Sequence, residues 1–72
     1  MTLQQAQEVL THFAVEREAA HESNMDWQPS RESRKEIHEA KSVIDEHCFT
    51  TNSTRVEALG EETVLAMWSY DE

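Results

Sequence analysis

Residues 64–70 read Val-Leu-Ala-Met-Trp-Ser-Tyr and form the densest apolar run of this 72-residue chain. An acidic pair flanks the run on each side, Glu61-Glu62 before it and Asp71-Glu72 after it. On an α-helix, this run carries more apolar surface than a single face can hold. Its side chains must therefore be divided between a core within the chain and a surface that contacts another molecule.

The length of the chain limits its stability. A domain near this size buries only about 60% of the surface that its unfolded form exposes, and such domains usually add a disulfide, a metal or a second subunit. Cys48 is the only cysteine, so an intrachain disulfide is excluded and a homodimer becomes an expectation. The lone thiol and the lack of a secretory leader indicate a cytoplasmic setting. No apolar run approaches the roughly 20 residues that span a membrane.

The charge balance is strongly acidic, with 15 acidic and six basic residues and a formal net charge of −9. Nucleic acid and anionic lipid both require a basic surface, so we expect direct binding to neither. The charge suits a basic surface on another protein, and carboxylates on a rigid helical body could imitate the phosphates of a duplex. An ordinary acidic surface that only keeps the protein in solution explains the same composition and is commoner.

Two long helices are predicted in the first two thirds of the chain, which has one glycine and one proline in all. Thr2 and Gln5 have the spacing of a capping box, which predicts a helix over about 3–22. Its core side comprises Leu3, Ala6, Val9, Leu10, Phe13, Ala14, Arg17 and Ala20. Pro29, just before or in a first turn, and Ser30 as a candidate cap predict a second helix over about 29–48, and the short connection predicts an antiparallel hairpin.

The second helix has two contrasting sides. An apolar stripe comprises Ile37, Ala40, Val43, Ile44, His47 and Cys48. Four basic residues, Arg31, Arg34, Lys35 and Lys41, alternate with glutamates and are typical of a solvated face.

The last third of the chain can be interpreted in two ways. Residues 49–53 form a connection, and Thr54 with Glu57 again has capping-box spacing, which favours a third helix over about 55–70. Gly60 opposes this helix, because glycine inside a helix costs about 1 kcal/mol relative to alanine. The alternative is a β-hairpin that turns at Gly60-Glu61. Composition favours the helix, so the sequence predicts one all-α, three-helix domain over residues 1–72.

Histidines and the cysteine do not form a pattern that carries chemistry. His21 and His47 face the core side but lie about 25 Å apart in the predicted hairpin, and no Cys-x-x-Cys or His-Glu-x-x-His motif occurs. Cys48 lies on the apolar stripe, where an inert thiol is usual. A bundle this small also offers little room for a ligand pocket of about 300 Å³. We therefore expect no catalytic residue, no metal site and no cofactor.

Helical phasing divides the opening run. Val56, Leu59, Thr63, Ala66, Met67 and Tyr70 share one face and would complete the core. The predicted partner-binding residues are those left outside that face and the neighbouring acids: Val64, Leu65, Trp68, Glu61, Glu62 and Asp71. Alternatively, Trp68 packs within the fold against Trp27 or Phe49.

The function expected from these features is that of a small acidic, non-catalytic protein. It would bind and inhibit or regulate a larger protein, one that handles nucleic acid being a candidate, and a phage or mobile element is a candidate source. The alternative is a homodimeric structural or regulatory adaptor with the C-terminal segment in the dimer seam.

Overall fold

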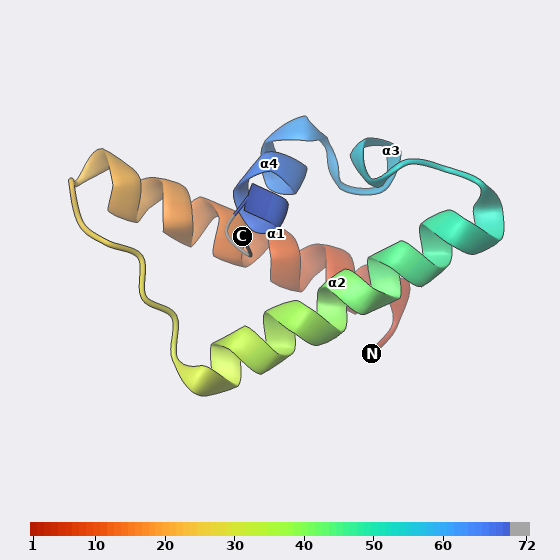
Figure 1. Ribbon diagram of the computed structural model, residues 1–72, viewed down its shortest axis with the longest axis horizontal. Helices are drawn as coiled ribbons and strands as arrows, with labels where there is room; N and C mark the ends of the chain where they lie inside the picture. The colour runs from red at the N-terminus through yellow and green to blue at the C-terminus, as the bar shows by residue number, and fades with distance from the viewer. Residues whose placement is uncertain (70–72) are drawn as a thin grey trace.

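The computed structural model describes residues 1–69 and shows an all-α chain (Figure 1). The helices are α1 (Leu3–Glu22), α2 (Arg31–Thr51), α3 (Arg55–Leu59) and α4 (Glu61–Ser69), and residues 1–69 contain no strand. The all-α prediction is therefore confirmed, and the alternative with a C-terminal β-hairpin is wrong. Within the same residues, no helix combines the length and the apolar character that crossing a membrane requires.

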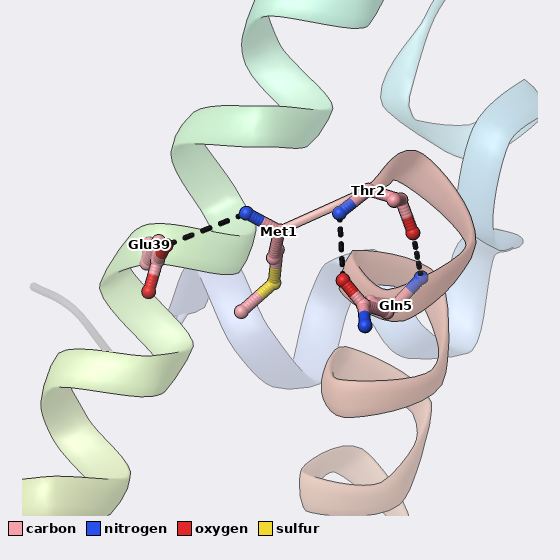
Figure 2. A network of polar contacts seen from close by, with 4 residues as sticks. All are labelled: Met1, Thr2, Gln5 and Glu39. Atoms are coloured by element: carbon pink, nitrogen blue, oxygen red, sulfur yellow. Dashed lines mark hydrogen bonds and ion pairs between the residues drawn. The ribbon is translucent and has the colours of Figure 1, made fainter.

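Helix α1 begins with the capping box that the sequence predicts. The Gln5 amide donates to Thr2 Oγ1 at 3.2 Å, and the Thr2 amide donates to Gln5 Oε1 at 2.8 Å (Figure 2). These two bonds satisfy amides that have no partner inside the helix. The Met1 amino group lies 3.6 Å from Glu39 Oε1, so the start of α1 is also tied to the middle of α2.

Helix α2 is displaced towards the C-terminus relative to the expected range of 29–48. Pro29 precedes the helix, and Ser30 caps it by accepting a hydrogen bond from the Ser33 amide at 3.1 Å. The helix continues through Thr51, where the sequence pattern predicted a connection. The Thr50 and Thr51 hydroxyls donate to carbonyl oxygens one turn earlier, at 2.9 and 2.8 Å, so both threonines are accommodated in the helix.

The end of α2 is set by Asn52. This residue adopts a left-handed conformation, with φ 55° and ψ 37°, and its amide donates to the Cys48 carbonyl. Asparagine tolerates this conformation better than most residues, so it terminates the helix where the β-branched threonines do not.

Helices α1 and α2 run in opposite directions, as predicted for an antiparallel hairpin, and they pack against each other (Figure 1). They diverge towards the connection of residues 23–30 (Figure 1). Helix α4 packs on α1 and is seen nearly end-on beside the middle of that helix. The C-terminal half of α1 therefore extends past α4.

The single third helix that the sequence predicts is instead two helices that meet at Gly60. This residue has φ 92° and ψ 152°. Its amide donates to the Val56 carbonyl at 2.7 Å and closes α3, while its carbonyl accepts from the Val64 amide at 3.2 Å and opens α4. Gly60 therefore ends one helix and starts the next, and the expected continuous helix is wrong.

The core joins three of the four helices. The largest fully buried side chains are Leu10 from α1, Ile44 from α2 and Met67 from α4. The remaining apolar core comprises Ala6, Phe13, Ala14, Ile37 and Ala40. Met67 and Thr63 are buried as the helical phasing predicts, whereas Val56 is about half exposed because α3 turns away at Gly60. Tyr70, also expected in the core, lies outside the described residues.

Candidate functional site

A groove lies between α4 and the C-terminal half of α1. Four α4 residues line it at the spacing of one helical face: Glu62, Leu65, Ala66 and Ser69. Opposite them are Arg17, Glu18 and His21 of α1 and Met25, Asp26 and Trp27 of the following connection. We call these ten residues the α1–α4 groove. Its volume is about 630 Å³.

The expectation that this chain is too small for a pocket is therefore wrong. A parallel three-helix bundle would have filled the space beside α1 with one long third helix. The break at Gly60 starts α4 at Glu61, and within the described residues this helix packs beside only part of α1. The groove forms in the angle between α4 and the part of α1 that extends past it.

The apolar part of the groove contains two strongly exposed side chains. Met25 is 66% exposed and Leu65 is 58% exposed. Beside them, Ala66 and Trp27 are half-buried and pack against the core. The Trp27 ring lies 6.4 Å from the Phe13 ring, centroid to centroid, at an interplanar angle of 49°. The groove is thus supported from below by the core, while its two largest aliphatic side chains remain accessible.

The rim of the groove is acidic. Glu18, Asp26 and Glu62 are exposed carboxylates, and Arg17 is the only lysine or arginine among the lining residues. With His21 neutral, these groups give the groove a formal charge of −2. Glu62 also lies in the first turn of α4, where a carboxylate interacts favourably with the helix dipole. A cationic ligand would therefore experience an attractive field at this rim.

Trp68 lies against a different part of the molecule. Its ring has Lys41 Nζ at 5.1 Å and the Arg55 guanidinium carbon at 4.9 Å from the centroid, both within cation–π range. Arg55 Nε also donates to Asp45 Oδ1 at 2.7 Å. Trp68 is half-buried and packs against the core. It therefore joins α4 to α2 and α3, and it does not line the groove.

Lys41 corrects the expectation of a fully solvated basic face on α2. This residue is only 7% exposed, and its ammonium donates to the Met67 carbonyl at 3.0 Å. The aliphatic stem crosses from α2 to α4, and the charged end reaches the last turn of α4, where a cation interacts favourably with the helix dipole. Arg31, Arg34 and Lys35 are exposed or nearly so, as expected.

The predicted partner-binding residues separate into three groups. Leu65 and Glu62 line the α1–α4 groove. Val64, Glu61 and Trp68 do not line it, although Glu61 is exposed. Asp71 lies outside the described residues. Trp68 packs within the fold, as the alternative held, but its ring partners are Lys41 and Arg55, and Phe49 is 90% exposed.

The α1 side of the groove was not predicted from the sequence. The available signal was the pair Met25 and Trp27, two large apolar residues in a connection where small polar residues are usual. Nothing in the sequence pattern joined that pair to Leu65, because their proximity depends on how α4 crosses α1.

The ionisable residues form no metal centre in the part of the chain that the structure describes. Residues 1–69 contain no group of three or more histidine, cysteine, aspartate or glutamate side chains placed to hold one ion. Cys48 is a free, half-buried thiol beside the core.

No protein-family model, no curated protein sequence and no solved structure matches this chain.

Proposed function

We propose that this chain is a small non-catalytic protein that binds a larger protein and inhibits or regulates it through the α1–α4 groove. The observation that carries this proposal is the pair of large apolar side chains, Met25 and Leu65, each more than half exposed and lining one groove. Large apolar side chains that remain exposed in one groove with a few polar groups at its rim favour a binding site. The groove volume of about 630 Å³ also suits the insertion of partner side chains.

The charge of the chain favours a protein as the partner. A net charge of −9 repels nucleic acid and anionic membranes, whose recognition requires basic residues. The same charge accelerates encounter with a basic protein surface. Proteins that handle nucleic acid carry such surfaces, so we place the partner among them.

A capture experiment with matched variants tests the role of the groove. The wild type, Leu65→Asn and Val15→Asn are immobilised and exposed to lysate, after circular dichroism has shown equal helix content. Val15 is the control because it is 63% exposed on α1 but does not line the groove. We expect one set of proteins to be captured by the wild type and Val15→Asn and lost with Leu65→Asn. Equal capture by all three would contradict the proposal.

Imitation of a nucleic-acid backbone is a more specific form of this proposal. The exposed carboxylates of α1 include Glu8, Glu16, Glu18 and Glu22, which lie along a single rigid helix. If they occupy the partner's nucleic-acid site, duplex DNA added to the capture experiment should displace the partner. Capture that persists in excess DNA would contradict imitation of a nucleic-acid backbone and would leave the groove as the binding site.

The second candidate function is a homodimeric adaptor. The exposed Met25 and Leu65 favour it, because a second copy could cover them. Against it, two grooves placed face to face would bring the carboxylates of Glu18, Asp26 and Glu62 towards those of the other copy. Like charges juxtaposed at an interface oppose association, so the heterologous partner is preferred.

A further inference from the structure

We infer that the partner segment held in the α1–α4 groove is a basic amphipathic helix. This inference rests on the proposed function and adds the chemistry of the occupant. It follows from the shape of the groove, the distribution of its charges and the positions of the remaining basic residues.

The shape of the groove favours a helical occupant. One wall is a single face of α4, with Leu65 and Ala66 in the middle and Glu62 and Ser69 at the two ends. From Glu62 to Ser69 this wall rises by about 10 Å, the length of about two helical turns. The opposite wall is contributed by α1 and by the connection after it, which supplies the apolar Met25 and Trp27. An apolar groove beside a helix is a usual receptor for an apolar helix face, whereas residues 1–69 offer no strand edge to an extended peptide.

The carboxylates at the rim favour an occupant with a positive charge. Glu18 on α1 and Glu62 on α4 stand on opposite walls, and Asp26 lies in the connection. Residues 56–69 contain three glutamates and no lysine or arginine, and the cations that reach α4, Lys41 and Arg55, lie at Trp68, which does not line the groove. An occupant with an apolar stripe flanked by lysine or arginine would place its cations against these carboxylates.

The other basic residues of the chain are directed elsewhere. Lys41 and Arg55 are held at the Trp68 ring, and Arg31, Arg34 and Lys35 belong to the first turns of α2. Among the described lining residues, Arg17 alone opposes a cationic ligand. This arrangement supplies a test of sign, because removal of Arg17 should strengthen binding where removal of a carboxylate weakens it.

The test uses three labelled synthetic peptides of about 14 residues, about four helical turns. The first carries leucine at i, i+3, i+4 and i+7 with lysine at the polar positions. The second replaces each lysine with glutamate, and the third keeps the first composition but scrambles the leucine spacing. Fluorescence anisotropy measures affinity, and amide chemical shifts in ¹⁵N-labelled protein locate the bound peptide.

We expect the first peptide to bind, with shifts centred on Leu65 and Met25, and the other two to bind at least about tenfold more weakly. Leu65→Asn should weaken binding about tenfold, as expected for loss of one buried leucine contact, and Val15→Asn should not change it. Glu18→Gln with Glu62→Gln should weaken binding several-fold and reduce its salt dependence. Arg17→Gln should strengthen it, and the exposed pair Glu36→Gln with Glu46→Gln on α2 should leave it unchanged.

Each remaining result overturns a defined statement. Equal binding of the acidic or scrambled peptide, or binding that ignores Leu65→Asn, overturns the basic helix as occupant. If no peptide binds while capture from lysate still depends on Leu65, the proposed function stands and the occupant has another chemistry. If capture also ignores Leu65, the proposed function itself fails. Self-association of the wild type that Leu65→Asn abolishes identifies a second copy as the occupant and overturns the inference.

Discussion

Gly60 shows how one residue redirects the C-terminal part of the chain. Its φ of 92° and ψ of 152° belong to a region that residues with a Cβ atom rarely enter. A Cβ atom built there would meet nothing within 4 Å, so the cost of a substitution is conformational. We expect Gly60→Ala to lower the free energy of unfolding by about 1–3 kcal/mol, measured by urea denaturation.

Asn52 provides the matched control at a second positive-φ position. Its φ of 55° and ψ of 37° are equally accessible to glycine, which is the commonest residue at helix ends of this type. Asn52→Gly should therefore change the free energy of unfolding by less than about 0.5 kcal/mol. If Gly60→Ala lowers the free energy of unfolding as little as Asn52→Gly does, the backbone conformation at residue 60 does not require glycine.

Lys41 is the clearest case of a charged residue used inside the fold. Lys41→Met keeps the aliphatic stem and removes both the bond to the Met67 carbonyl and the cation over the Trp68 ring. These contacts together contribute about 2–4 kcal/mol to stability. The methionine variant no longer has the cost of burying a charge, which offsets part of the loss. We expect a net loss of about 1–2 kcal/mol in urea denaturation. Lys35→Met, exposed on the same helix, should be close to neutral, and equal effects would remove this role from Lys41.

At the scale of elements, local sequence signals predicted the first helix well. The capping box of Thr2 and Gln5 and a regular apolar stripe agree, so α1 occupies the range that they indicate. Helix α2 ends three residues beyond the predicted position, because Thr50 and Thr51, in the predicted connection, continue the helix. Their hydroxyls bond to carbonyls within the helix, and the positive φ of Asn52 ends it. Side-chain hydrogen bonds of this kind are not visible in a hydrophobic pattern.

The segment that forms α3 and α4 could not be predicted from local sequence signals alone. Glycine is costly inside a helix, but the sequence does not say whether the chain accepts that cost or avoids it with a break. In the structure the break is present, and Met67 of α4 is buried in one core cluster with Leu10 and Ile44. The same limit applies to the site: phasing predicted Val64, Leu65 and Trp68, of which only Leu65 lines the groove, and the opposite wall depends on the crossing of α1 and α4.

The capping box permits a direct test at the level of one element. Thr2→Ala removes the acceptor of the Gln5 amide, which is otherwise unpaired in the first turn. We expect a loss of about 1 kcal/mol in the free energy of unfolding and faster amide hydrogen exchange at the start of α1. Thr11→Ala is the control, because Thr11 is exposed within the same helix and alanine favours helix formation. Equal loss in both variants would contradict the contribution of the cap.

At the scale of the whole molecule, charge and packing act in opposite directions. Three helices enclose a small core, and the excess of nine negative charges repels itself across a short chain. The Trp68 ring counters part of this by drawing Lys41 of α2 and Arg55 of α3 towards α4. The acidic rim around Met25 and Leu65 carries a formal charge of −2 out of the total of −9. An acidic partner would be repelled by that rim, and a basic one would be attracted by it.

Salt dependence therefore separates the two functions that the groove could serve. At about 10 mM ionic strength the Debye length is about 30 Å, so two acidic grooves repel each other over their full extent, while at 1 M it falls to about 3 Å. We expect sedimentation velocity at high micromolar concentration to show a monomer at low salt. Any dimer should appear only at high salt and disappear in Leu65→Asn. Binding of a basic partner should change in the opposite sense, weakening as salt is added. A dimer that persists at low salt, or a partner whose affinity ignores salt, would show that the acidic rim does not govern what this groove binds.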